Sequence, residues 1–540
     1  MDLRLTFLTF IKMLTADSDT QPVVQTTYGK IQGQILSTVQ EPHLEYYAFR
    51  GIPYAKPPLE ELRFQPPLKP EPWENVKPCV DYGNSCLQVS KKDGSVLGNE
   101  DCLTLNVFTK ELNTSNLKPV MFWIHGGAHI RGSSAQFPPD YLIEKPVVFV
   151  SINYRLNIFG FFTVNDENAY GNAALKDQVA ALEWVQGNIA GFGGDPSRVT
   201  ICGESSAANS VALLQLSTRA RGLFHQVIAE SGSALNARYL QRNPLKYAYN
   251  IAKYFNVTTE TTRDMVEGLQ KVDSEELAKA ANSSQATGYK TDLYAFPFFP
   301  IIEVENSEAI ITRSPYQILQ SGDFNRVPFM IGFNTNDGSV GLNIVTLEMN
   351  ISDFDKYYKL FAPQSLNNER DSLMVGLVVR NHFLGNSSAK NTEMFSQFLG
   401  QELLIRGIRK QIDFQRTLSE GYFYRFSYKG SFATDPKGPK HGEELNYLFP
   451  KDERTDVDAN DNLTRTRMVE MWTNFAIVGS PIPDNKLLGE SISWKKCDNT
   501  SVYFLDIGDK LILGTNPNET DFQFWNALFQ KFGRKPYVTY

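Results

Sequence analysis

Several features that would point to a simple functional class are absent from this sequence. No run of about 18 apolar residues occurs, which argues against a membrane-spanning helix. Lys and Arg total 53 against 60 Asp and Glu, and the sequence shows no basic stripe of the kind that nucleic-acid binding needs. Apolar residues make up 42% and charged residues 21%, which is the balance of an ordinary globular protein.

Cysteine is scarce and occurs in an odd number, so at least one thiol stays unpaired. No C-x-x-C pair indicates a metal site, and nothing in the sequence calls for a cofactor. The five residues are Cys79, Cys86, Cys102, Cys202 and Cys497.

The N-terminus is ambiguous. Residues 1–16 combine Arg4 with the apolar run 5–11, but Lys12 interrupts that run, so the segment is at best a weak signal peptide. We expect a secreted protein, with a cytoplasmic one carrying a disordered tail as the alternative. Eight N-x-[ST] glycosylation candidates point the same way, although a chain rich in Asn, Ser and Thr produces some by chance. They are Asn113, Asn256, Asn282, Asn350, Asn386, Asn462, Asn499 and Asn518.

Strand-like and helical patterns alternate, which is typical of the α/β class. The apolar runs 120–124 and 147–154 indicate strands covered on both faces, and apolar residues recur at three- and four-residue steps over 172–192. Further strands are expected at 327–333 and 422–428. Because no repeat or flexible linker divides the chain, we expect one domain with helical excursions.

The segment Gly203-Glu204-Ser205-Ser206-Ala207 follows a short apolar run and precedes a helix of small residues. A strand–turn–helix of this kind exposes a nucleophilic serine at the carboxyl end of a sheet. Alone the string is weak, because a Gly-Ser turn before a helix would look similar.

A second glycine-rich turn strengthens this interpretation. His125-Gly126-Gly127-Ala128 follows the strand expected at 120–124, and its small residues let backbone N–H groups face a cavity. Such donors stabilise the negative oxygen of a tetrahedral intermediate.

A nucleophilic serine needs a base and an acid that orients the base. His441 lies in a polar loop after the strand expected at 422–428, and Asp337 follows the one at 327–333. The order Ser205, Asp337, His441 is that of the α/β-hydrolases.

Together these motifs resemble the type-B carboxylesterases, the family of the cholinesterases, juvenile hormone esterases and insect detoxifying esterases. The resemblance covers about residues 24–530. It implies an α/β-hydrolase fold, with a large, mostly parallel, twisted sheet flanked by helices. Further segments that carry it are Phe49-Arg50-Gly51-Ile52-Pro53-Tyr54-Ala55, Glu100-Asp101-Cys102-Leu103, Asn153-Tyr154-Arg155-Leu156, Phe192-Gly193-Gly194-Asp195-Pro196 and His441-Gly442-Glu443-Glu444-Leu445.

The resemblance also implies roles for individual residues. Ser205 would be the nucleophile, His441 the general base and then acid, and Asp337 the acid that orients the imidazole. The oxyanion donors would be the N–H groups of Gly127, Ala128 and Ser206, and Cys86 and Cys102 would form the family's first disulfide. The substrate pocket would include His129, Glu204, Tyr294 and Phe296.

The chain departs from its relatives at several of these positions. Most relatives carry Glu at the position of Asp337, an aromatic residue at that of His129, and Ala-Gly-Gly in place of residues 206–208. We expect the methyl group of Ala207 to crowd the strand–helix contact, so that Ala207→Gly raises turnover. Residues 87–101 contain no tryptophan, unlike the loop that binds quaternary ammonium in cholinesterases, so a cholinesterase is not expected.

We therefore expect a serine carboxylesterase that acts on a small ester substrate and water and has no nucleic-acid partner. The ester would be small and apolar: a xenobiotic ester, an odorant or pheromone acetate, or a juvenile-hormone-type ester. The last is less favoured, because relatives with that role usually have Gln at the position of Glu204. The alternative is a catalytically decayed, esterase-like binding or adhesion module. The sequence leaves the oligomeric state open.

Overall fold

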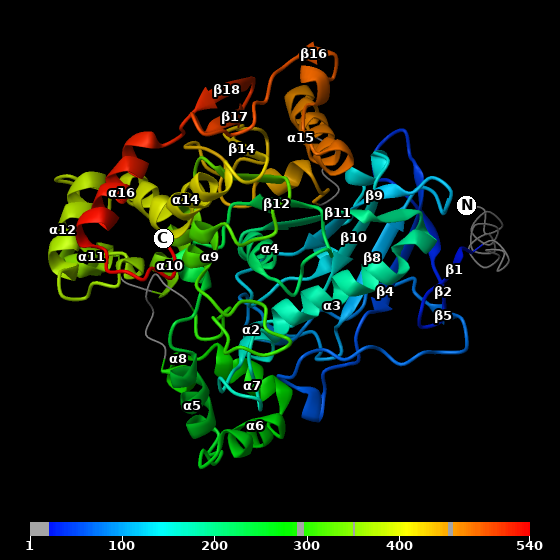
Figure 1. Cartoon of the computed structure of the whole chain (residues 1–540), viewed down its shortest axis with the longest axis horizontal. Coiled ribbons are helices and arrows are strands. Elements are labelled where there is room, and N and C mark those ends of the chain that lie inside the picture. The colour runs from blue at the N-terminus through cyan, green and yellow to red at the C-terminus, as the bar shows by residue number, and fades with distance from the viewer. Residues whose placement is uncertain (1–20, 289–295, 349–350, 452–456) are drawn as a thin grey trace, which may run out of the picture.

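The computed structural model describes residues 21–288, 296–348, 351–451 and 457–540, and Figure 1 shows the whole chain. Within these residues the main sheet has 11 strands. In spatial order they are β18 (Leu511–Thr515), β17 (Tyr503–Ile507), β14 (Gly421–Phe426), β13 (Phe329–Asn334), β12 (Gln226–Glu230), β11 (Gly194–Glu204), β9 (Lys118–Ile124), β10 (Val148–Ile152), β8 (Thr104–Thr109), β4 (Glu45–Pro53) and β3 (Gln34–Ser37).

The sheet is parallel at its centre and antiparallel at its edges. From β17 through to β10 every neighbouring pair is parallel. The pairs β17–β18, β10–β8, β8–β4 and β4–β3 are antiparallel. The expected large, mostly parallel sheet is therefore confirmed, and so are the strands expected at 120–124, 147–154, 327–333 and 422–428, with shifted ends.

Alternate residues of the central strands join two different apolar cores. On β9, Phe122 and Ile124 belong to one core, whereas Met121 and Trp123 belong to the other. Because successive strand side chains point to opposite faces, a strand covered on both faces must be apolar throughout. This is the physical reason for the uninterrupted apolar runs in the sequence.

Helices cover both faces of this sheet (Figure 1). On one face lie α3 (Ala173–Asn188) and α4 (Ser206–Leu216), whose apolar residues share the core of Phe122. On the opposite face α15 (Ala459–Val478) packs Met471 and Trp472 into the core of Trp123. The helix expected at 172–192 is α3 followed by a 3₁₀ turn, Ile189–Phe192, which ends at Gly193 with φ 78°.

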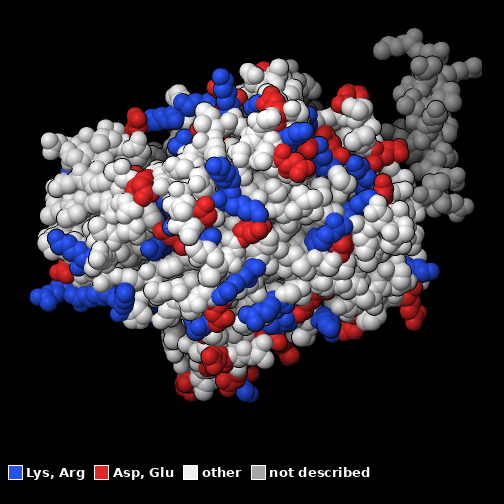
Figure 2. Space-filling model, turned by 45° about the horizontal axis from the view of Figure 1, so that its top comes forward, with Lys and Arg blue, Asp and Glu red and all other residues white. Residues whose placement is uncertain are grey.

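The carboxyl ends of the parallel strands lie at one edge of the sheet, which is where open α/β sheets bind ligands. The ends of β9, β11, β13 and β14 carry the four segments that the sequence singles out. Figure 2 shows basic and acidic side chains interspersed over one face of the molecule. Among the described residues no helix has the length and apolar character needed to span a membrane.

Candidate active site

Ser205 occupies the sharp turn between β11 and α4. Its backbone lies at φ 59° and ψ −121°, in the left-handed half of φ space that side chains other than glycine seldom adopt. The Ser205 N–H donates to the Glu230 carbonyl on the adjacent strand at 2.8 Å, which holds the turn in place. Strained residues that are fixed in this way cluster at functional sites.

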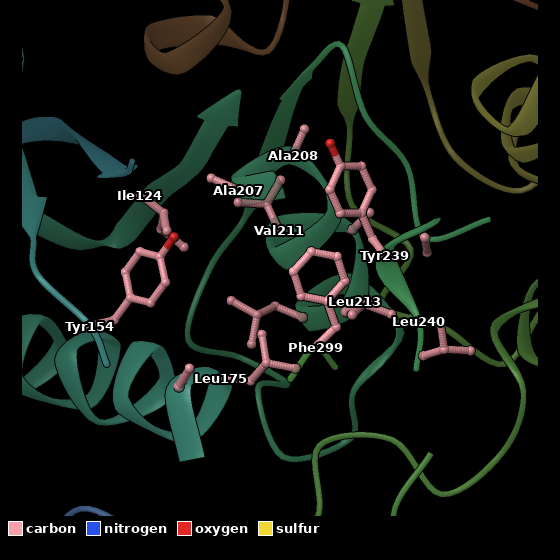
Figure 3. Packing of buried hydrophobic residues seen from close by; sticks show 14 of the residues in the cluster. Ile124, Tyr154, Leu175, Ala207, Ala208, Val211, Leu213, Tyr239, Leu240 and Phe299 are labelled. Atoms are coloured by element: carbon pink, nitrogen blue, oxygen red, sulfur yellow. The ribbon is translucent and has the colours of Figure 1, made fainter. Parts of the chain in front are cut away.

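Small residues allow α4 to lie close to the sheet. A Cβ atom on Gly203 would meet the Cβ of Ala207 at 2.7 Å, and one on Gly232 would meet the Cβ of Ala208 at 2.8 Å. The two alanine methyl groups thus occupy space that these glycines leave open. Figure 3 shows Ala207 and Ala208 among the buried residues that pack around α4. This differs from the crowding that we expected at Ala207, because the residues opposite carry no side chain.

The structure brings Ser205, His441 and Asp337 together. The Ser205 Oγ lies 2.7 Å from His441 Nε2, and His441 Nδ1 lies 2.8 Å from Asp337 Oδ1. The other carboxylate oxygen of Asp337 accepts hydrogen bonds from the Ser231 hydroxyl and the Asn334 N–H, both at 2.9 Å. The shorter Asp side chain therefore reaches the imidazole while its second oxygen is fixed from two sides.

Two further carboxylates lie near this chain of hydrogen bonds. Glu204 Oε1 is 3.2 Å from His441 Nε2, and Glu444 bonds to Asn334. Burial raises the pKa of Glu204, opposed by the nearby His441. Burial, together with Glu204 and Asp337, raises the pKa of Glu444 to about 8. Three buried carboxyl groups, those of Glu204, Asp337 and Glu444, therefore gather around His441.

The same carboxylates control the proton affinity of His441. Burial alone lowers the pKa of this imidazole, but the charges of Glu204 and Asp337 outweigh burial and raise the pKa to about 9. The imidazolium form is thus favoured in this site, which is what a base needs once it has taken the serine proton.

The loop after β9 lies directly against Ser205. A Cβ atom on Gly126 would meet the Glu204 carbonyl at 2.7 Å and the Ser205 Cβ at 3.4 Å. Within the described part of the chain, the N–H groups of Gly127 and Ala128 make no hydrogen bond. Ser206 opens α4, and the first N–H groups of a helix have no acceptor inside it. The three expected oxyanion donors therefore belong to segments that adjoin the serine.

The predicted pocket residues are only partly brought together. His129 is buried near Tyr239 and Phe299, with ring centres 6.2 and 5.6 Å away. Phe296 contacts Phe299 at 5.3 Å between ring centres, and Tyr294 lies outside the described residues.

Sequence reasoning missed Tyr239 and Ser231. The Tyr239 hydroxyl lies 3.3 Å from Ser205 Oγ, and Ser231 holds Asp337. Ser231 follows β12 directly, so its position at a strand end was an available signal, whereas no pattern marks Tyr239.

The structure pairs Cys86 with Cys102, with an S–S distance of 2.02 Å, as the resemblance implied. Cys79, Cys202 and Cys497 are unpaired and buried. Burial raises the pKa of the Cys202 thiol well above its usual value. A buried thiol of raised pKa is a poor nucleophile, so cysteine chemistry does not compete with Ser205.

The sequence profile of the Carboxylesterase family matches residues 20–525, nearly the whole chain. The chain belongs to the carboxylesterase family. It is 33% identical to the juvenile hormone esterase of Tribolium castaneum over 534 residues, which cover 91% of this chain and 89% of the relative. It is 32% identical to carboxylesterase 1E of Mus musculus and 31% to a carboxylic ester hydrolase of Bombus ignitus, each alignment covering 94% of both chains.

A solved structure extends this likeness to three dimensions. The crystal structure of juvenile hormone esterase from Manduca sexta, with OTFP covalently attached, superimposes with a TM-score of 0.83 at 25% identity. The match covers 94% of this chain and all of the other chain. The α/β-hydrolase fold is thus confirmed, and this member of the carboxylesterase family is a carboxylic-ester hydrolase.

Proposed function

We propose that the chain hydrolyses carboxylic esters through an acyl-enzyme intermediate on Ser205, with His441 as base and Asp337 as the orienting acid. One observation carries the proposal: the three side chains form a continuous line of hydrogen bonds, 2.7 and 2.8 Å long, from the segments that follow three different strands. A nucleophile, a base within reach of it and a group that orients the base are what covalent catalysis needs.

The geometry supports a two-step reaction. Ser205 donates its hydroxyl proton to His441 Nε2 and attacks the ester carbon, and the N–H groups of Gly127, Ala128 and Ser206 receive the resulting oxyanion. The imidazolium then protonates the departing alcohol. In the second step a water molecule gives its proton to His441 and attacks the acyl group, and Ser205 recovers its proton as the acid is released.

The substrate that we propose is a small apolar ester, of the xenobiotic, odorant- or pheromone-acetate, or hormone type. The side chains near the serine support this class, because Tyr239 and its neighbour Phe299 are aromatic and buried. Burial lowers the pKa of His129 to about 3, so this ring carries no charge at neutral pH. Juvenile hormone esterases among the similar proteins keep a hormone-type ester among the candidates.

We also propose that the protein is secreted and glycosylated. The Cys86–Cys102 disulfide supports an oxidising compartment, since such bonds are rare in the cytosol. Of the eight candidate asparagines, Asn350 lies outside the described residues and the other seven are exposed. The test is to express residues 1–540 in insect cells and to treat the protein recovered from the medium with an endoglycosidase. Recovery from the medium is expected for a secreted protein, and a fall in mass is expected for a glycosylated one. An unchanged mass would contradict glycosylation.

The function is tested with Ser205→Ala and a panel of p-nitrophenyl esters of increasing acyl length. Loss of the nucleophile typically costs on the order of a millionfold in turnover, so no measurable activity is expected while the fold is unchanged by circular dichroism. A fluorophosphonate probe should label the parent once, at Ser205. Activity of the alanine variant within tenfold of the parent would refute the assignment, and the panel should show the highest kcat/KM for the shortest acyl groups.

A further inference from the structure

The loop that would bind the oxyanion has an unusual backbone. Ala128 and His129 are consecutive and both have left-handed φ values, 57° and 56°. This region of φ disfavours residues with a Cβ atom, and two such residues in succession are rarer still. A conformation of this kind persists only where neighbouring groups hold it. Side chains that hold the loop therefore control where its N–H groups point.

His129 is attached to the rest of the protein at three points. Its N–H donates to Ser206 Oγ at 3.1 Å, its carbonyl accepts from the Asn157 N–H at 2.7 Å, and its ring Nε2 lies 3.1 Å from Ser210 Oγ. Ser206 and Ser210 are four residues apart on α4, so both face the loop from one side of the helix.

The Ser206 hydroxyl also connects to the start of the loop. It lies near the Tyr154 hydroxyl, which donates to the His125 carbonyl at 2.7 Å. In Figure 3 the Tyr154 side chain lies beside Ile124, the last residue of β9. Ser206 therefore bonds the loop at His129 and adjoins the tyrosine that bonds the start of the loop at His125.

We propose that His129, Ser206 and Ser210 form a clamp that positions the oxyanion donors of this enzyme. The proposal rests on the function proposed above, in which Gly127, Ala128 and the Ser206 backbone bind the oxyanion. Because one donor belongs to α4 and the other two to the loop, their spacing depends on what joins the loop to the helix. Oxyanion donors act only when they lie about 2.7–3.1 Å from the developing charge, so a small displacement lowers the rate.

His129 and Ser206 are both polar, and the hydrogen bond between the His129 N–H and the Ser206 hydroxyl joins the loop directly to α4. The clamp side chains touch neither the reacting serine oxygen nor its base, so they position the donors, one of which is the backbone N–H of Ser206. Their effect is on the transition state and not on substrate binding.

The test uses Ser206→Ala and His129→Phe, which remove the serine hydroxyl that bonds the loop and the ring nitrogen that faces Ser210. Both variants should lower kcat for p-nitrophenyl acetate about tenfold or more, with KM within about twofold. The inhibition constant of a methyl trifluoromethyl ketone should rise by a similar factor, because its hemiketal oxygen occupies the oxyanion site. Ser217→Ala is the matched control, because Ser217 is a buried serine at the other end of α4 and does not contact the loop.

A second measurement separates the clamp from general packing. If the ring of His129 acts through Ser210, His129→Phe and Ser210→Ala should not be additive, and the double variant should resemble either single one. Additive losses would overturn the link between these two side chains.

The clamp is refuted if Ser206→Ala and His129→Phe keep kcat and the ketone inhibition constant within twofold of the parent. It is also refuted if Ser217→Ala produces equal losses. Either result, together with an inactive Ser205→Ala, leaves the proposed function standing. An active Ser205→Ala variant would instead refute the function itself.

Discussion

At the scale of single residues, the site is governed by the balance of charge around His441. Its Nε2 faces both Ser205 and the Glu204 carboxylate, while its Nδ1 faces Asp337. Burial disfavours the imidazolium, and the two carboxylates favour it more strongly. A proton transferred from the serine to this imidazole would therefore be well stabilised, but the imidazole also binds a proton more tightly than a free histidine does.

This balance predicts the pH profile. A base must be neutral to act, so a pKa of about 9 for His441 means that kcat/KM rises with pH through that value. A histidine with an unperturbed pKa would instead lose activity only below about pH 6–7. Removing the Glu204 charge with Glu204→Gln should move the rise to lower pH. Profiles from pH 6 to 10 check this, and a rise near pH 6.5 in both proteins would contradict it.

The acid of the site can be tested against its neighbours. Asp337→Asn should lower kcat by about four orders of magnitude, because the imidazole loses its orienting acceptor and the stabilisation of its charged form. Glu443 accepts hydrogen bonds from Thr434 and the Lys440 N–H and does not contact His441, so Glu443→Gln should be nearly silent. Steady-state rates of both variants measure this. A nearly silent Asp337→Asn together with an inactive Glu443→Gln would show that Glu443 is the acid.

At the scale of elements, the turn between β11 and α4 determines how close the helix comes to the sheet. The contact works because Gly203 and Gly232 lie opposite Ala207 and Ala208. The sequence predicted a steric clash at Ala207, because the pattern of small residues on the helix does not show which residues pack against it. In the fold the two sides complement each other.

This complementarity reverses the expectation for Ala207→Gly. The variant loses a fully buried methyl group and places a glycine in a helix, which together cost about 1–2 kcal/mol of stability. Turnover should stay within about threefold of the parent, because no crowding is relieved. Urea unfolding and kcat measure the two effects separately. A gain in turnover with unchanged stability would restore the crowding interpretation.

At the scale of the whole molecule, the sheet brings distant segments into one site. Ser205 lies 236 residues from His441 in sequence, and Asp337 lies 104 residues from it. The acid and base loops are joined directly, since the Asn336 N–H donates to the Pro439 carbonyl at 3.1 Å. The site is therefore a property of the folded sheet and not of any segment that could fold alone.

The disulfide contributes to the stability of this fold. Cys86 and Cys102 are 16 positions apart, and closing a loop of that size is worth about 3 kcal/mol in the chain-entropy account. A variant with serine at both positions should have a free energy of unfolding, measured with urea, that is lower by about 3 kcal/mol. Adding a reducing agent provides the control: it should destabilise the parent and leave the variant unchanged. A parent that is insensitive to reduction would show that the bond adds no stability.

The sequence determined the fold class and the candidate nucleophile. Uninterrupted apolar runs require strands covered on both faces, and the order of glycine, serine and small residues after one such run requires a tight strand–helix turn. These are local constraints, set by side-chain periodicity and by the φ values that small residues permit. The same apolar patterns predicted that Asp337 and His441 lie in loops that follow strands.

The tertiary structure decided which residues from distant parts of the sequence meet in the site, and local sequence patterns carry no information about such contacts. Tyr239 reaches Ser205 Oγ, Ser231 holds Asp337, and Glu204 alters the proton affinity of His441, all through contacts between separate strands and loops. A pKa depends on burial and on charges brought near in space, and a methyl group is crowded or well packed according to what lies opposite it. Neither quantity is defined until the chain has folded, because both are set by residues that the sequence keeps far apart.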